Sequence, residues 1–245
     1  MTDEIGLGKY WKRLIEERHY SLKDYLLVLS KMQNKDKASF LLLLSRFLRE
    51  TVVIPELSSL FSEKALPFIN NQRIKAEYYF ECGETSALQG NFQKALDYLE
   101  KSLKISIKLY VENHPIVADT YNSLGLAYAE KEDYQNAFAL VKKAICISTK
   151  CNGEKCALTA AYYNSLGEIC IAQGDAPKTM EFLCKSLEIN QYLFGNYHRI
   201  VALAYSNLGS ACWKANESQM ALKFEKKALE IQQVLFGENH TDVAT

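Results

Sequence analysis

Helix-breaking residues are scarce in this sequence, which has only 4 prolines and 11 glycines among 245 residues. Proline and glycine interrupt helices and strands, so a chain with few of them and with long stretches of helical apolar periodicity is expected to be all-α. A surplus of one charge is also missing, because basic and acidic residues number 29 each. Nucleic-acid-binding surfaces normally show a basic excess, and we therefore expect no nucleic-acid partner.

Long apolar runs are missing as well. The longest, Phe40–Leu44, falls far short of the roughly 18 residues that cross a bilayer. The first residues, Met1–Arg13, carry charges from the start and contain no apolar core of signal-peptide length. These two observations predict a cytoplasmic protein without a membrane span.

Metal-binding and catalytic motifs are not found in the sequence. Cys146, Cys151 and Cys156 are five residues apart, whereas the cysteines of a zinc motif are separated by about two to four residues. There is no phosphate-cradling glycine loop, no His-Glu-x-x-His motif and no nucleophile elbow. The sequence therefore predicts no enzyme, no metal site and no cofactor. Three other cysteines fall at apolar positions and are interpreted as small buried side chains in a reducing compartment: Cys82, Cys170 and Cys212.

The sequence does contain a motif that recurs every 42 residues, and a fixed period of this size predicts a stacked repeat array. Its central glycines are Gly83, Gly125, Gly167 and Gly209. Four residues before them stand Tyr79, Tyr121, Tyr163 and Tyr205. This spacing places the motif on the apolar packing face of a first helix. Glycine inside a helix costs about 1 kcal/mol relative to alanine, so its recurrence predicts that a second helix crosses too closely there for a Cβ atom.

A second helix is predicted after a short turn. Its start is marked by the N-cap acceptors Asn91, Asp133 and Asp175. Small residues twelve positions after each glycine would let the two helices approach closely: Ala95, Ala137, Thr179 and Ala221. Thr179 and Glu225 depart from the pattern in the last two repeats. The exposed side of this helix carries lysines that we interpret as solvated surface: Lys101, Lys142, Lys143, Lys185, Lys226 and Lys227.

A recurring segment joins each second helix to the next repeat. It contains Glu-Asn-His before one first helix and again near the end of the sequence, and Cys156 replaces the histidine at another joint. The histidines recur because the joint recurs, and a full repeat separates them, which argues against a metal site. They are His114, His198 and His240.

The helix pair resembles the tetratricopeptide repeat, which has Leu-Gly at the centre of the first helix and a small residue twelve positions on. The 42-residue period and the joint are similar to the subtype found in kinesin light chains, over residues 72–245. The resemblance implies a right-handed superhelical solenoid of antiparallel helix pairs, whose concave groove is lined by first helices and holds a peptide or partner helix. Residues 71–245 would form four repeats, near 71–113, 114–155, 156–197 and 198–240, and begin a further one.

Residues 1–70 lie before the clear repeats and are expected to form helices near residues 8–18, 21–33, 36–50 and 56–69. Ser21 with Asp24 marks a helix start, and Pro55 fits the first turn of the last of these helices. The segment is either a degenerate repeat over 36–69 or a distinct helical cap. Both interpretations assign it the same task, which is to cover the open end of the stack.

The groove-facing side of each first helix is expected one residue away from its packing face. Asparagine and serine recur there, and an amide can both donate to and accept from the backbone of an extended peptide. Alternatively, these side chains brace neighbouring helices. Matching asparagines line the groove in the kinesin-light-chain type. The candidate binding residues are Phe80, Glu84, Asn122, Leu126, Asn164, Glu168, Ser206 and Trp213.

The groove is expected to be acidic, with Lys214 as its only base; its acidic residues are Glu77, Glu84, Asp119 and Glu168. Phe80 and Glu84 occupy positions where chaperone-binding members of the family carry the lysine and asparagine of a carboxylate clamp, so that clamp is not expected. We expect the ligand to be a neutral-to-basic peptide or a helix with apolar anchors.

The sequence thus predicts a non-enzymatic scaffold or adaptor that binds a protein or peptide in its groove. One alternative is a structural module that associates with a copy of itself through its exposed last helix. Another is the binding region of a larger signalling protein or of a host-mimicking bacterial effector, which would work in the host cytosol. The effector interpretation rests on a composition that suits an AT-rich genome.

Overall fold

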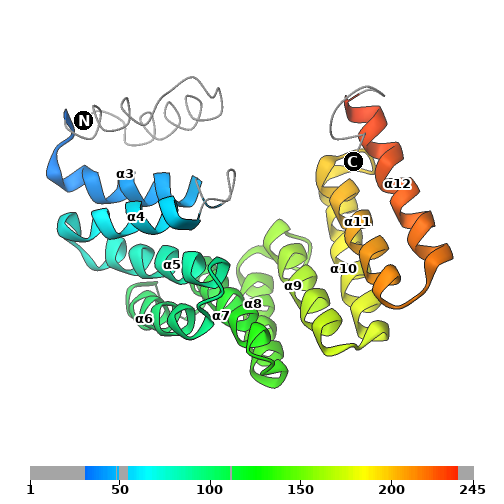
Figure 1. The fold of residues 1–245 in the computed structure, drawn as a ribbon, viewed down its shortest axis with the longest axis horizontal. Coiled ribbons are helices and arrows are strands. Elements are labelled where there is room, and N and C mark those ends of the chain that lie inside the picture. Colours follow the sequence, from blue (N-terminus) through cyan, green and yellow to red (C-terminus); the bar gives the residue numbers. More distant parts are fainter. Residues whose placement is uncertain (1–30, 48, 50–54, 111, 237–245) are drawn as a thin grey trace.

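The structure is a computed structural model that describes residues 31–47, 49, 55–110 and 112–236. All regular secondary structure in these ranges is helical, as predicted. The elements are α3 (Asn34–Phe47), α4 (Pro55–Ala65), the 3-10 helix η2 (Leu66–Phe68), α5 (Gln72–Leu88), α6 (Phe92–Tyr110), α7 (Pro115–Glu130), α8 (Tyr134–Asn152), α9 (Ala157–Gln173), α10 (Ala176–Phe194), α11 (Arg199–Lys214) and α12 (Ser218–Phe236). Figure 1 shows them as an arch, with α3–α6 in one arm and α10–α12 in the other.

The predicted helix pairs form as the repeat requires. The first helices are α5, α7, α9 and α11, and each packs against the second helix that follows it. Each of the second helices α6, α8 and α10 also packs against the first helix of the next repeat. The chain is therefore an all-α solenoid.

Helices α3 and α4 pack against each other and against α5, at the N-terminal end of the stack. They correspond to the helices predicted near 36–50 and 56–69, and Pro55 is the first residue of α4, as expected. The two stretches predicted near 8–18 and 21–33, with the helix start at Ser21, lie wholly or largely outside the described residues. The cap and the degenerate repeat both stay predictions, as do the domain limits.

The central glycines lie where the second helix crosses the first. A Cβ atom on Gly125 would be 2.5 Å from Val141 Cγ2 and 2.9 Å from the Ala137 carbonyl oxygen. At Gly83 it would be 2.6 Å from Leu99 Cγ. Close-packed interiors do not tolerate such distances without displacement of a neighbour. The predicted close crossing is confirmed, and its tightest contact in these repeats is a residue sixteen positions after the glycine.

The recurring joint supplies an N-cap to the next first helix. His114 precedes α7, and its Nδ1 accepts a hydrogen bond from the Ile116 N–H at 3.2 Å. His198 makes the same contact at α11. At α9 the sulfur of Cys156 accepts from the Thr159 N–H at 3.4 Å. The joint histidine is therefore a capping residue, a role that the sequence pattern did not identify.

The lysines of the second helices are exposed, as predicted, but four of them also contact the motif tyrosines. Each lysine nitrogen lies between 5.5 and 5.8 Å from the centre of the ring, in the pairs Lys101–Tyr79, Lys143–Tyr121, Lys185–Tyr163 and Lys227–Tyr205. A cation–π contact at an exposed site contributes about 0.5–1 kcal/mol. A lysine–tyrosine contact thus recurs with the 42-residue period, as the apolar contacts of the core do.

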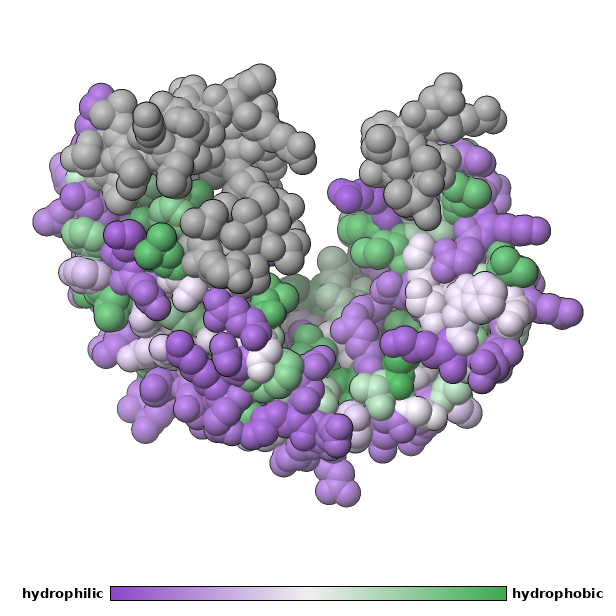
Figure 2. Space-filling view, viewed as in Figure 1, coloured by the Kyte–Doolittle hydropathy of each residue, from purple (hydrophilic) through white to green (hydrophobic). Residues whose placement is uncertain are grey.

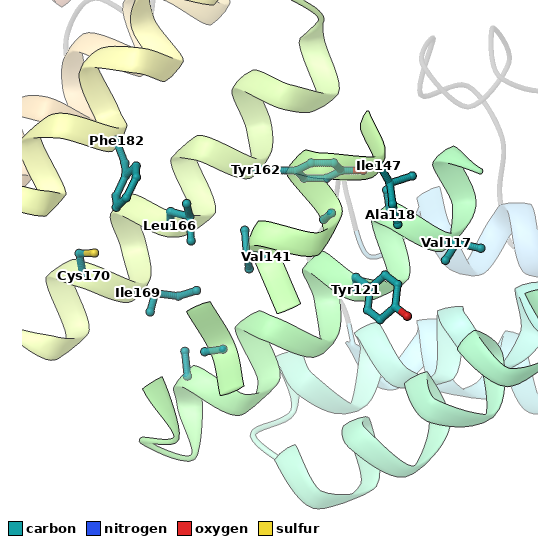
Figure 3. Packing of buried hydrophobic residues seen from close by; sticks show 13 residues of the cluster. Val117, Ala118, Tyr121, Val141, Ile147, Tyr162, Leu166, Ile169, Cys170 and Phe182 are labelled. Atoms are coloured by element: carbon teal, nitrogen blue, oxygen red, sulfur yellow. The ribbon is translucent and has the colours of Figure 1, made fainter. Parts of the chain in front are cut away.

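One core cluster extends from the repeat of α7 and α8 into the repeat of α9 and α10. Figure 3 shows Tyr121 of α7, Val141 of α8 and Leu166 of α9 in one cluster, which extends to Phe182 of α10. The three cysteines that were expected to be buried are buried: Cys82, Cys170 and Cys212. No helix within the described ranges is long and apolar enough to cross a membrane.

Candidate functional site

A cleft of about 500 Å³ opens between α3, α5, α6 and α7. Its lining includes three of the predicted binding residues, Phe80, Glu84 and Asn122, together with the predicted groove residues Glu77 and Asp119. The cleft lies in the arm of the arch that contains α3–α6, and Figure 2 shows the molecular surface as a U with a hollow between the two arms. These predicted residues of α5 and α7 thus lie in one cleft, and their role in binding stays a prediction.

Asn122 presents an unsatisfied acceptor in this cleft. Its Oδ1 atom is buried and has no hydrogen-bond partner among the described residues. Ser106 on α6 lines the same cleft, and its Oγ atom is also buried without a hydrogen-bond partner among the described residues. A buried polar atom without a partner costs about 1–3 kcal/mol, so the cleft contains two positions that a donor from a ligand would stabilise.

Asn164 occupies the same repeat position as Asn122, but both its amide nitrogen and its amide oxygen are hydrogen-bonded. Its Nδ2 donates to Glu168 Oε1 at 2.7 Å, and its Oδ1 accepts from Asn207 Nδ2 at 2.7 Å. The counterpart of Asn207 one repeat earlier is Ser165, whose hydroxyl donates to the Ala161 carbonyl at 3.3 Å. Asn164 therefore braces α9 against α11, whereas Asn122 has no such neighbour to engage it.

The other predicted binding residues do not line the α3–α7 cleft. Leu126 and Ser206 are half-buried, and Glu168 is exposed. The surrounding protein raises the pKa of the Glu168 carboxyl, and the hydrogen bond from Asn164 opposes this rise. Trp213 is 48% exposed on α11. Lys214 lines a separate pocket of about 200 Å³ between α9, α10 and α11.

The expectation that Lys214 is the only base of the groove is wrong. Arg46 and Arg49 from the α3 region line the α3–α7 cleft, as does Arg73 at the start of α5. Arg46 pairs with Glu77 at 3.3 Å, and Arg49 pairs with Glu84 at 2.5 Å. Arg46, Arg49 and Arg73 form a basic wall of the cleft. This wall could not be predicted from the sequence because α3 lies outside the repeat pattern, so the 42-residue period does not place its residues.

Glu81 lies behind this wall and holds both arginines. Its carboxylate is fully buried and binds Arg46 at 2.6 Å and Arg49 at 2.9 Å. The carboxylates of Glu77 and Glu84, which were predicted to make the groove acidic, are therefore paired with arginines. They belong to a network of ion pairs that joins α3 to α5.

Asp119 on α7 has no ion pair among the residues that the structure describes. Its Oδ1 accepts a hydrogen bond from the buried Tyr162 hydroxyl at 2.5 Å. Burial raises the pKa of Asp119 above its usual 3.8, the Tyr162 bond lowers it, Glu84 raises it further and Arg46 lowers it. Asp119 is thus a charged acceptor in the cleft that only a neutral hydroxyl contacts.

The raised pKa leads to a prediction about stability. Replacing Asp119 by asparagine, which can still accept from Tyr162, is expected to stabilise the fold at neutral pH. Because the folded state binds the Asp119 proton more tightly than the unfolded state, the free energy of unfolding of the native chain falls as pH rises through this pKa. The variant lacks this loss, which amounts to about 1.4 kcal/mol for each unit of pKa difference.

Urea denaturation at a series of pH values measures this effect. The stabilities of Asp119→Asn and of the native chain should diverge as pH rises from below 3.8 toward neutrality. An equal pH dependence in both proteins would contradict the assigned environment of Asp119.

The described part of the chain holds no group of three or more His, Cys, Asp or Glu side chains arranged so that they could bind one metal ion. His114 and His198 are engaged as N-caps. His240 lies outside the described residues.

The repeat geometry is matched by comparison with known proteins. The model of the tetratricopeptide repeat family matches residues 76–150, 120–191 and 158–233, which together span more than half of the chain. The chain therefore belongs to the tetratricopeptide repeat family. No curated protein sequence matches it at a significant level.

Solved structures share the fold at low sequence identity. BtubC (BKLC) from P. vanneervenii is 20% identical, with a TM-score of 0.68 over 85% of this chain and 84% of that one. A putative kinesin light chain from Podosopora anserina is 17% identical, with a TM-score of 0.65 over 83% and 98%. A Rap protein is 17% identical, with a TM-score of 0.65 over 97% of this chain and 61% of its own. The chain thus shares the fold of these structures.

Proposed function

We propose that this chain is a non-enzymatic interaction scaffold that binds a peptide or a partner helix in the α3–α7 cleft. The observation that carries the proposal is the buried, unpaired Oδ1 of Asn122. The N–H groups of an extended peptide are the donors that such an acceptor lacks. Membership of a family of repeat arrays, whose function is generally protein interaction, supports the same class of activity.

The remaining walls of the cleft suit a peptide with apolar anchors. Phe80, Tyr110 and Ile116 contribute apolar surface, and the unpaired hydroxyl of Ser106 adds a second polar contact. Binding sites commonly combine apolar walls with a few placed polar groups. The Rap protein of similar fold is described as complexed with competence and sporulation factor, which supports the use of such an array as a receptor.

A random peptide library displayed on phage would test the proposal, with the selected peptides measured by isothermal titration calorimetry. Asn122→Ala is expected to weaken binding roughly fivefold, the effect of losing one hydrogen bond. Ser165→Asn is expected to weaken it as well, because the new amide can donate to Asn122 as Asn207 does to Asn164. The matched control is Gln135→Ala, which removes an exposed amide from α8 and should change nothing.

Two results would count against the proposal. The first is that no peptide survives selection. The second is that the selected peptides bind Asn122→Ala, Ser165→Asn and the native chain with the same affinity, which would place their site elsewhere.

Self-association through α12 stays a prediction. It is favoured by the exposure of Leu222, which is 51% exposed where its counterpart Leu96 is 4% exposed.

A further inference from the structure

Three hydrogen-bond acceptors belong to residues that line the α3–α7 cleft, two of them without a donor and the third, the Asp119 carboxylate, with a neutral donor. Asn122 Oδ1 and Ser106 Oγ are buried and unpaired, and the Ser106 side chain is fully buried. Asp119 adds a carboxylate, and it lies three residues before Asn122 on α7, where side chains on one helix face are about 5–6 Å apart. A serine hydroxyl can accept as well as donate. A ligand with several hydrogen-bond donors could therefore bind all three groups.

The charge of Asp119 favours a cationic ligand. Its one side-chain bond comes from the neutral Tyr162 hydroxyl. The nearby cations are committed elsewhere, because Arg46 binds Glu77 and Glu81 and Arg49 binds Glu81 and Glu84. Arg73 is exposed at the start of α5. Among the described residues, Asp119 thus has no ion-pair partner of its own, although Arg46 lies near enough to lower its pKa.

We infer that Asp119, Asn122 and Ser106 form a receptor for the guanidinium group of an arginine side chain in the bound peptide. A guanidinium has five N–H donors in a fixed planar fork, so it can contact a carboxylate and neighbouring neutral acceptors together. An ammonium presents a point charge with three donors and lacks this planar reach. Phe80 lines the same cleft, and guanidinium groups stack on aromatic rings.

This inference rests on the proposed function, since it names one residue of the ligand for the same cleft. Its test uses small probes and a readout located at the site. Acetyl-arginine methylamide is titrated into the native chain while the NMR signal of the Asn122 side-chain amide is followed. Acetyl-citrulline methylamide has the same shape without the charge, and acetyl-lysine methylamide has the charge without the fork.

The arginine probe is expected to shift the Asn122 amide signal at millimolar concentration and to bind about tenfold more tightly than either other probe. Asp119→Asn, which preserves the acceptor for Tyr162, should lower the affinity for the arginine probe by about tenfold and leave that for the citrulline probe unchanged. The control Glu188→Gln removes an exposed carboxylate on α10 and should have no effect.

Equal affinities for the arginine and citrulline probes would overturn the inference. So would equal affinities for arginine and lysine, an unchanged affinity in Asp119→Asn, or no shift of the Asn122 signal. If peptides from the library still depend on Asn122 in any of these cases, the proposed function stands and only the guanidinium assignment fails. If the arginine probe binds as expected but no library peptide depends on Asn122, the proposed function fails by itself.

Discussion

Replacing Glu81 by alanine is expected to lower the free energy of unfolding by about 3 kcal/mol. The Glu81 side chain is fully buried on α5, and its two oxygens bind Arg46 at 2.6 Å and Arg49 at 2.9 Å. The alanine variant removes a counter-charge from Arg49, which is only 8% exposed. Arg49 keeps Glu84 but loses its fully buried partner, and a buried charge that loses a partner without regaining water is destabilising.

Urea denaturation followed by circular dichroism measures this loss. The matched control is Glu188→Ala, which removes an exposed carboxylate of α10 and should change the stability by less than about 0.5 kcal/mol. A loss below about 1 kcal/mol for Glu81→Ala would mean that the ion pairs add little to the docking of α3 on α5. Another interaction would then have to hold Arg46 and Arg49 in the cleft.

Replacing Gly125 by alanine is expected to lower the free energy of unfolding by about 2 kcal/mol. The added Cβ would be 2.5 Å from Val141 Cγ2 and 2.9 Å from the Ala137 carbonyl oxygen. The carbonyl belongs to the backbone of α8 and cannot rotate away, so the two helices must separate. Overpacking of this kind costs about 1–3 kcal/mol, and it outweighs the gain of about 1 kcal/mol from placing alanine in a helix.

Gly209→Ala is the matched control for this prediction. The nearest neighbour of a Cβ atom there is the carboxylate end of Glu225, a flexible side chain that stands where the earlier repeats have Leu99, Val141 and Leu183. Moving it costs little, so this variant should be neutral or more stable by up to about 1 kcal/mol. Equal effects at both glycines, measured by urea denaturation, would show that helix propensity outweighs the helix crossing.

The repeat pattern predicted the helices from α5 to α12 because one physical requirement, a close helix crossing, is imposed four times. Gly125 illustrates this, since its contacts with Val141 and Ala137 recur with a period that the sequence displays. The same regularity placed Phe80, Glu84 and Asn122 in one cleft. The period therefore sufficed to place residues of α5 and α7 on a common surface, while their role in binding stays a prediction.

The basic wall could not be predicted in this way. Arg46 and Arg49 lie outside the repeat, and their contacts with Glu81 depend on how α3 docks on α5. The difference between Asn122 and Asn164 was also hidden. Both occupy the same repeat position, and only the neighbouring side chain in the next helix, Ser165 or Asn207, decides whether the amide braces helices or stays unpaired. Such pairings follow from individual residues and not from the period.

The most direct test of the account is a crystal structure of the chain with the tightest peptide selected from the library. The account predicts that the peptide lies in the α3–α7 cleft and that a peptide N–H or side-chain donor is within hydrogen-bonding distance of Asn122 Oδ1. A peptide bound on the outer faces of the second helices, or one that leaves Asn122 without a donor, would contradict it.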